Sequence, residues 1–342
     1  MQLGLTVSNF GNKVGVNMDL IRLAEQLGFE ACFTAEAYGS DAATPLAWIG
    51  AQTSKIKLGS AIMQIYGRTP AAAAMTAITI DELSGGRFLF GLGPSGPQVV
   101  EGWHGVSYDK PLSHLREYIE VIRRIIRREK AVTFEGEFYH LPYKGPKATG
   151  LGVPLKSIMH PRKDMKIYTA GITPNSVRLA AEIADGFFPV WTNPERFGVY
   201  TDILAEGFKR AGNGKGYGQF DIIQNVRVVL GDDVAACRDS VRPDLALVIG
   251  GMGARGKNFY NDHISRQGYE DEARKIQDLF LDGKHKEAAA AVSDKLIDDV
   301  TLVGPREKIA DRVTAWKGTP VTMLNLSATK PEELQLMAEL LL

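Results

Sequence analysis

The chain has 342 residues and carries 40 Lys and Arg against 40 Asp and Glu, so its formal net charge is zero. With 44% hydrophobic and 23% charged residues, it has the composition of an ordinary globular protein with a large core. The balanced charge excludes the basic footprint of a nucleic-acid-binding protein. No apolar stretch approaches the roughly 20 residues that span a bilayer. We therefore expect a cytoplasmic protein with no nucleic-acid or membrane partner.

In the first half of the chain, short apolar runs alternate with amphipathic segments, a pattern that indicates parallel β/α units. The pattern predicts strands at Gln2–Ser8, Ala31–Tyr38, Lys57–Gln64 and Phe88–Gly93. It predicts helices at Val16–Phe29, at 41–54, from Pro70 to the glycines at 85–86, and at Pro111–Glu129. A hairpin is expected at Val132–Tyr143, within an insertion spanning about residues 130–165.

The alternation resumes in the second half. Strands are predicted at Lys166–Ala170, Phe187–Trp191, Ile222–Leu230 and Val321–Leu326. Helices are predicted at Pro174–Asp185, Pro194–Ala211, Val234–Ile249 with a break at Pro243, Pro305–Trp316 and Pro331–Leu342. A second, helical insertion is expected at about residues 250–300.

Eight strands, each followed by helical sequence, favour a (β/α)₈ TIM barrel with two insertions, a single domain over residues 1–342. An open, doubly wound sheet with a helical cap is the alternative, because the sequence does not show whether the sheet closes. In a barrel, ligands bind at the carboxyl ends of the strands. The residues that follow the predicted strands, beginning with Ser8 and Asn9, are rich in Gly, Ser, Thr, Asn and aromatic side chains. They include one carboxylate and no His or Cys, which suits an organic cofactor better than metal or nucleophilic chemistry.

Two glycine-containing turns are the clearest binding signals. The run Gly91-Leu-Gly-Pro-Ser-Gly96 follows a strand and formally matches the dinucleotide-binding GxGxxG pattern, but we expect no helix to open directly after it. An ordinary turn, or backbone lining a flat ring, fits better. In the run Gly171–Ser176, Thr173 can cap a helix whose first residue is Pro174. The amides of Asn175 and Ser176 would then be free to bind phosphate, although ordinary capping without a ligand remains open.

Individual side chains at the predicted rim suggest further roles. Glu36 is a candidate general acid or base, or a hydrogen-bond partner of a cofactor ring, and a structural ion pair is the alternative. Tyr38, Trp48 and Trp191 are candidates to wall a substrate pocket, with core packing as the alternative. The two cysteines, Cys32 and Cys237, have no metal-binding spacing, so we expect buried thiols and no metal site.

Taken together, several stretches resemble the luciferase-like flavin and deazaflavin oxidoreductases, and most closely the branch that uses coenzyme F420. That branch includes methylenetetrahydromethanopterin reductase and the F420-type glucose-6-phosphate dehydrogenase. The matching stretches span most of the chain: Ala24–Tyr38, Lys57–Gln64 with Arg68–Pro70, Asp81–Gly93, Ser95–Trp103, Lys110–Arg124 and Ser176–Asp185 with Gly186.

The resemblance implies a barrel whose third strand ends in a bulge with a non-prolyl cis peptide under the cofactor ring, matched here by Ala61 and Ile62. It implies that the ring lies beside a loop matched by Gly93, Ser95, Gly96 and Gln98. It also implies a phosphate-binding turn, matched by Gly171, Thr173, Asn175 and Ser176. Glu36 takes the place of an acidic residue near the ring. The implied phosphate-binding turn agrees with the helix-terminus argument made from the residues themselves.

The match departs from the sugar-phosphate branch, where a His follows the acidic residue; here that position is Ala37, and an acidic residue of the fourth loop is replaced by Gln98. The implied activity is hydride transfer between F420 and an unsaturated or carbonyl-type substrate, in a homodimer, as relatives often are. An FMN-dependent monooxygenase of the same fold is the first alternative. A deazaflavin-binding protein without turnover is the second.

Overall fold

In the computed structural model, which describes residues 1–7 and 12–342, parallel strands close into a barrel. Going around it, the strands are β1 (Gln2–Thr6), β2 (Ala31–Thr34), β3 (Lys57–Ser60), β5 (Phe88–Gly93), β8 (Ile167–Ala170), β9 (Gly186–Phe188), β10 (Asp221–Leu230) and β12 (Met323–Ser327). The pairings of β9 with β10 and of β12 with β1 complete the ring. The predicted (β/α)₈ barrel is confirmed, and the open-sheet alternative is wrong.

Two further parallel strands extend this sheet. β4 (Met63–Gln64) follows β3 after a bulge and pairs with β5. β11 (Leu302–Gly304) pairs with the far end of β10, and the sequence pattern did not predict it. Ser8, where the first strand was predicted to end, and Asn9 lie outside the described residues.

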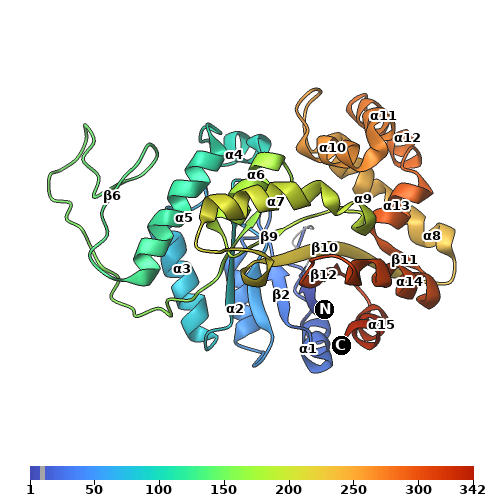
Figure 1. Ribbon diagram of the computed structural model, residues 1–342, viewed down its shortest axis with the longest axis horizontal. Helices are drawn as coiled ribbons and strands as arrows, with labels where there is room; N and C mark the ends of the chain where they lie inside the picture. The colour runs from blue at the N-terminus through green and yellow to red at the C-terminus, as the bar shows by residue number, and fades with distance from the viewer. Residues whose placement is uncertain (8–11) are drawn as a thin grey trace.

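Helices surround the barrel (Figure 1). They are α1 (Met18–Leu27), α2 (Ala43–Gly50), α3 (Pro70–Leu83), α4 (Pro97–Gly102), α5 (Pro111–Arg127), α6 (Pro174–Ile183), α7 (Gly198–Ala211), α14 (Arg306–Lys317) and α15 (Pro331–Leu341). Their ends follow from local chemistry: the Asn17 side chain accepts a hydrogen bond from the Leu20 amide, and Gly28 ends α1 with a φ of 88°. Thr69 caps α3 ahead of Pro70.

The barrel interior has an apolar lower layer. Phe33, Leu89, Tyr168, Phe188, Ile223 and Met323 form one buried cluster there. Gly59 makes room for it, because a Cβ at this position would lie 2.2 Å from the Phe33 ring. A second and larger core fills the space between the outer faces of the strands and the surrounding helices. The two layers fix the strands from both sides, so side chains at the carboxyl ends are held in place.

The two segments predicted as insertions leave the barrel at different places (Figure 1). β6 (Phe134–Glu135) and β7 (His140–Leu141) form an antiparallel hairpin, as predicted, in an extended arm on the left. The helical segment on the right contains α8 (Val234–Asp239), α9 (Arg242–Ala246), α10 (Phe259–Ile264), α11 (Glu270–Leu281), α12 (His285–Ala290) and α13 (Asp294–Val300). It has its own buried cluster.

Short irregular helices complete the structure. The predicted helix 194–211 begins with a 3₁₀ turn, η1 (Pro194–Arg196), before α7, and a second turn is η2 (Tyr217–Gln219). The predicted helix 234–249 is broken between α8 and α9, just ahead of Pro243. A π-helical stretch, η3 (Leu247–Gly251), precedes α10, and η4 (Ser265–Tyr269) follows it as a turn kinked at Gly268, whose φ is 94°.

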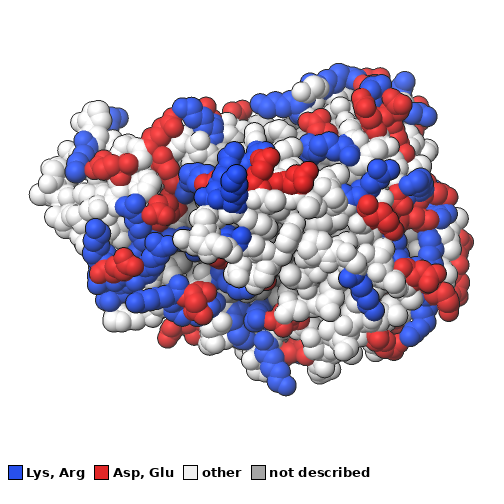
Figure 2. All heavy atoms as spheres, viewed as in Figure 1, with Lys and Arg blue, Asp and Glu red and all other residues white. Residues whose placement is uncertain are grey.

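The surface carries both signs of charge close together, as Figure 2 shows for one face. Cys32 and Cys237 are buried free thiols, as predicted. Over residues 1–7 and 12–342, no group of three or more His, Cys, Asp or Glu is placed to hold a metal ion. None of the helices in this part of the chain is long and apolar enough to cross a membrane.

Candidate functional site

A bulge between β3 and β4 shapes one side of the barrel mouth. The peptide bond between Ala61 and Ile62 is cis, as the family resemblance implied. Two hydrogen bonds join the bulge to the end of β2: the Ala61 amide donates to Thr34 O at 2.6 Å, and the Glu36 amide donates to Ile62 O at 3.2 Å. The side chains of Ala61 and Ile62 are partly exposed above the apolar layer of the barrel.

Beside the bulge, a small residue keeps the mouth flat. Gly93 ends β5, and a Cβ there would lie 3.0 Å from Ile62 Cδ1 and 3.7 Å from Ala170 Cβ. Ala61 and Ile62 in the bulge, Gly93 on β5 and Ala170 on β8 therefore form an apolar surface, which we call the floor. A floor made of small and aliphatic groups fits a planar aromatic ring and offers it few polar atoms.

Glu36, the candidate catalytic residue, is engaged in structural contacts at both carboxylate oxygens. Oε1 accepts from the Gln64 amide at 2.9 Å and from Arg68 Nη1 at 2.6 Å, and Oε2 accepts from the Ala42 amide at 3.0 Å. Its side chain is 5% exposed, and that of Arg68 is 21% exposed. This carboxylate ties β4 and the start of α2 to the end of β2. The geometry favours the ion-pair alternative and places Glu36 behind the bulge.

The predicted phosphate turn lies at the start of α6, next to the floor, because β8 pairs with β5. Thr173 caps the helix and Pro174 is its first residue, as predicted. The expectation of a free Ser176 amide is wrong, because this amide donates to Thr173 Oγ1 at 3.2 Å and Ser176 Oγ accepts from the Thr173 amide at 3.0 Å. This reciprocal capping box occupies the amides of Thr173 and Ser176, so neither is free to donate to a bound anion.

An arginine that the sequence pattern did not indicate lies at this turn. Arg266, on η4 just before its kink at Gly268, donates from Nη2 to Ile172 O at 2.5 Å. It is exposed, and among the described residues no carboxylate lies within 4.0 Å of it. The guanidinium adds a full positive charge to the partial positive charge of the helix N-terminus. Only the fold brings these two segments together, since they are about 90 residues apart in the sequence.

The loop after β5 forms the next part of the rim. Ser95 has a φ of 56°, and its carbonyl accepts a hydrogen bond from Tyr108 Oη at 3.0 Å. Gly96 precedes α4, so the expectation that no helix opens after this glycine is wrong, although α4 is only one turn and a half long. Gln98 lies on α4 and is exposed. Burial raises the pKa of Tyr108 to about 12, so its hydroxyl stays protonated near neutral pH.

The three aromatic residues predicted to wall a pocket are not brought together. Tyr38 and Trp48 are 66% and 61% exposed. Trp191 has a φ of 48° and packs against the cluster of the helical segment. Its carbonyl accepts from Gln267 Nε2 at 2.8 Å. Among the three, Trp191 is the one held at the rim, at the end of β9, by buried contacts.

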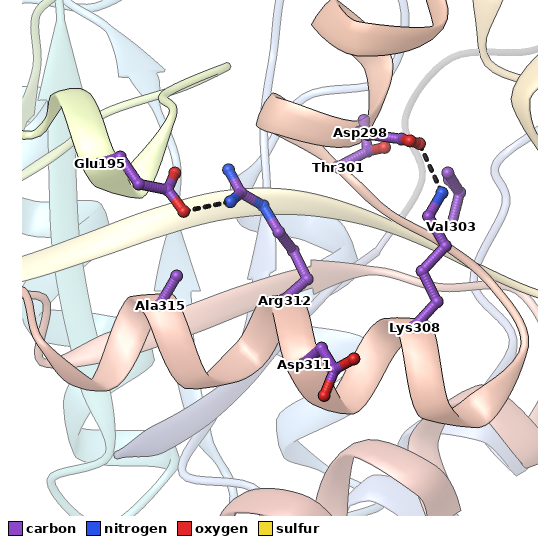
Figure 3. Close-up of a pocket in the computed structure, with 8 residues that line it drawn as sticks. All are labelled: Glu195, Asp298, Thr301, Val303, Lys308, Asp311, Arg312 and Ala315. Atoms are coloured by element: carbon purple, nitrogen blue, oxygen red, sulfur yellow. Dashed lines mark hydrogen bonds and ion pairs between the residues drawn. The ribbon is translucent and has the colours of Figure 1, made fainter.

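A separate hollow of about 290 Å³ lies outside the barrel, between η1, α13, β11 and α14. Figure 3 shows two ion pairs in it, Arg312 with Glu195 and Lys308 with Asp298, while Asp311 is directed away from both pairs. Within each pair the charges cancel, so neither pair offers a free charge to a ligand. The floor at the barrel mouth is the better candidate for a functional site.

A closed β/α barrel with a flat apolar floor and a cationic helix terminus at its carboxyl end defines the structural class of this protein. The sequence profile of the family described as luciferase-like monooxygenase matches residues 2–323. The chain belongs to this family.

Two relatives and one solved structure are similar to this chain over most of its length. It is 43% identical over 342 residues, with 99% of each chain covered, to the Mycobacterium tuberculosis H37Rv protein Rv3520c, named as a candidate coenzyme F420-dependent oxidoreductase. It is 27% identical over 310 residues to 5,10-methylenetetrahydromethanopterin reductase of Archaeoglobus fulgidus, covering 89% of this chain and 86% of the relative. The structure of the F420-dependent tetrahydromethanopterin reductase from Methanopyrus kandleri superposes with a TM-score of 0.80. That superposition covers 99% of this chain and 97% of the other at 23% identity, and it supports the fold.

Proposed function

We propose that this protein is a coenzyme F420-dependent oxidoreductase that transfers a hydride between the deazaflavin and an unsaturated or carbonyl-type organic substrate. The observation that carries the proposal is the floor of Ala61, Ile62, Gly93 and Ala170 beside a helix terminus with an unpaired arginine. The relative at 43% identity, named for F420 dependence, supports the choice of cofactor.

The residues present fit such a cofactor. Its ring would lie on the floor, where a side chain at residue 93 would stand in the way. Its phosphate would lie at the start of α6, near Asn175 and Arg266, and not against the Ser176 amide. When bound, the deazaflavin supplies a ring carbon that accepts or donates a hydride.

The protein itself contributes position and shielding. Thr34, Glu36 and Arg68 hold the bulge, so the floor keeps its shape when a ring is absent. We assign Glu36 as a positioning residue, since its oxygens already accept three hydrogen bonds inside the protein. The apolar layer below the floor excludes water from the lower face of a bound ring.

Equilibrium titration of the purified apo-protein with F420 and with FMN, followed by fluorescence, tests the proposal. We expect a preference for F420 of at least about 10-fold. Preference for FMN would assign the protein to the monooxygenase alternative, and binding without any substrate-dependent absorbance change would indicate a carrier protein.

Replacement of one arginine tests the phosphate position. Arg266→Gln removes the charge beside α6, and we expect F420 affinity to fall about 10-fold, with a smaller loss at high salt because the contact is electrostatic. Arg274→Gln is the matched control, because this exposed arginine pairs with Glu270 and Asp271 on the same segment. Equal affinities for the two variants would place the phosphate elsewhere.

We also propose a homodimer formed through the outer face of α2 and α3. On this face Trp48, Met75 and Leu83 are 61%, 67% and 76% exposed, although the two helices pack against each other. Burying such apolar side chains against a second copy stabilises association. Light scattering on a size-exclusion column measures the mass, and Met75→Lys should convert a dimer to monomers. A monomeric wild-type protein would contradict the proposal.

A further inference from the structure

A positively charged side chain lies inside the barrel mouth on strand β10. Alternate residues of a strand point to the same side, so Ile223, Asn225 and Arg227 share a face. Ile223 belongs to the apolar cluster of the barrel interior, and Asn225 Oδ1 accepts a hydrogen bond from Nδ2 of Asn325 on the neighbouring strand β12. Arg227 is the next residue on this face toward the carboxyl end. Its guanidinium therefore lies above the apolar layer, in the mouth.

The Arg227 guanidinium lacks an ionic partner in the described chain. Its one hydrogen bond runs from Nη1 to Ser327 O at 3.4 Å, and its Nε is buried without a partner. No carboxylate of residues 1–7 or 12–342 lies within 4.0 Å of it, whereas Arg238 and Arg242 on α8 and α9 each contact two aspartates. A guanidinium has five N–H donors, and leaving a buried one unpaired is costly. The unused donors indicate that a ligand completes this site.

The residues around Arg227 are polar. Asn325 Nδ2 also donates to Thr6 Oγ1 at 2.9 Å, which links β1, β10 and β12 at one level of the barrel. Asn325 Oδ1 is a second buried atom without a hydrogen-bond partner. We call Thr6, Asn225, Arg227 and Asn325 the polar wall. A wall with an unpaired donor and an unpaired acceptor is suited to a polar ligand group.

The order of strands places this wall opposite the floor. The floor lies on the bulge between β3 and β4, on β5 and on β8, which are neighbours, whereas β10, β12 and β1 are neighbours on the other arc of the closed barrel. A ring on the floor would leave the space in front of the polar wall for the second reactant. The cofactor ring would thus occupy the apolar half of the mouth, and the second reactant would occupy the half that contains Arg227.

We infer that Arg227 determines substrate specificity by binding an anionic group, a carboxylate or a phosphate, on the molecule that exchanges a hydride with the cofactor. A guanidinium binds either group through two parallel hydrogen bonds, so it fixes orientation as well as affinity. The identity of the molecule as a hydride acceptor or donor rests on the proposed function. The anion site itself stands on the geometry of Arg227.

Strand register supplies an internal test of the site. Ser327 on β12 is directly opposite Arg227 on β10, so the two side chains share a face and lie within reach of each other. Ser327→Asp places a carboxylate beside the guanidinium and competes with any external anion. Ser327→Asn has the same shape without the charge and is the matched control.

The experiment is a ¹⁹F NMR titration of the protein with 4-fluorobenzoate and with 4-fluorobenzamide, which differ in charge but hardly in shape. We expect the benzoate to bind at least about 10-fold more tightly to the wild type and to Ser327→Asn, as one charge-assisted contact predicts. The preference should fall below about 2-fold in Arg227→Gln and in Ser327→Asp. Equal binding of both probes to the wild type, or an unchanged preference in Arg227→Gln, would overturn the inference.

A parallel titration with F420 separates the two sources of an anion. If Arg227→Gln lowers F420 affinity about 10-fold and leaves the preference for benzoate unchanged, the arginine serves the cofactor and the inference is wrong. If the wild type binds no F420 but discriminates the two probes through Arg227, the anion site stands and the proposed function fails. Circular dichroism and an unfolding curve for each variant show whether a loss reflects misfolding.

Discussion

Replacing Glu36 by Gln separates a positioning role from proton transfer. The substitution keeps the shape of the side chain but removes its charge. A glutamine has one acceptor oxygen, and its amide nitrogen cannot accept a hydrogen bond. That nitrogen would replace either the oxygen that accepts from the Ala42 amide or the oxygen that accepts from the Gln64 amide and Arg68. At least one backbone amide or the guanidinium therefore loses its acceptor.

The expected loss of stability follows from these contacts. Removing one partner of a buried ion pair costs about 3–5 kcal/mol. Arg68 keeps Asp41 at 3.8 Å and remains 21% exposed, which reduces the penalty. We therefore expect Glu36→Gln to lower the free energy of unfolding by about 2–4 kcal/mol. Because Gln64 adjoins the bulge, F420 affinity should fall about 10-fold, with a smaller change in turnover at saturating cofactor.

The assay combines urea unfolding, F420 titration and turnover at saturating F420. Glu25→Gln is the matched control, since Glu25 Oε1 accepts from the amides of Ser54, Lys55 and Ile56 ahead of β3, at the opposite end of the barrel. It should lose stability and keep its F420 affinity. The reasoning is refuted if Glu36→Gln retains stability and affinity but loses turnover more than about 100-fold, because only a proton-transfer role gives that result.

Further predictions concern the floor, the barrel packing and the helical segment. Gly93→Ala should weaken F420 binding several-fold, because the new methyl group would occupy the floor, and a fluorescence titration measures this. It should cost little stability, because the Ile62 side chain, whose atoms would lie 3.0 Å from the new Cβ, can rotate away. Gly91→Ala should unfold the barrel in a thermal melt, because its Cβ would lie 1.8 Å from the rigid Ser60 carbonyl oxygen. Burial, and then the Arg266 charge, lower the pKa of His263 to about 4, so the folded protein holds this side chain neutral while the unfolded chain protonates it below about pH 6.5. Stability should therefore decrease as the pH falls from 6.5 to 4, by up to about 3 kcal/mol, and urea unfolding of His263→Gln should show a shallower pH dependence over this window.

The barrel was predictable from the sequence because its signals are local. Each strand is a short apolar run, and caps such as Thr69 with Pro70 and Thr173 with Pro174 mark helix starts without reference to tertiary contacts. The short strand β11 was missed, because its three residues have no recognisable period and pair with the end of β10 only after α8–α13 have folded back.

The candidate site was only partly predictable, because its contacts join distant segments. The turn at Thr173 was recognisable, but the capping box that occupies the Ser176 amide depends on side-chain rotamers. Arg266 reaches this turn from η4, a segment kinked at Gly268 (φ 94°), and no local sequence pattern indicates that contact. Trp48 has the residue type of a pocket wall, yet it lies exposed on α2. The sequence did not show this, because a helix of eight residues is too short for its apolar spacing to reveal which face is buried.

The distribution of unpaired groups separates binding surfaces from structural ones in this fold. Glu36, although it is the carboxylate expected at the rim, has its oxygens occupied by Ala42, Gln64 and Arg68, so its charge serves the protein. Arg227 and Arg266 have one hydrogen bond each, both to carbonyl oxygens, and no carboxylate partner in the described chain. The Arg227 Nε is buried without a partner, which is costly unless a ligand accepts its hydrogen bond, whereas the exposed Arg266 incurs no such penalty and is simply free to bind an anion. On the proposals above, we expect anionic groups at both arginines and the uncharged, planar part of the cofactor on the floor, beside Arg266 and opposite Arg227.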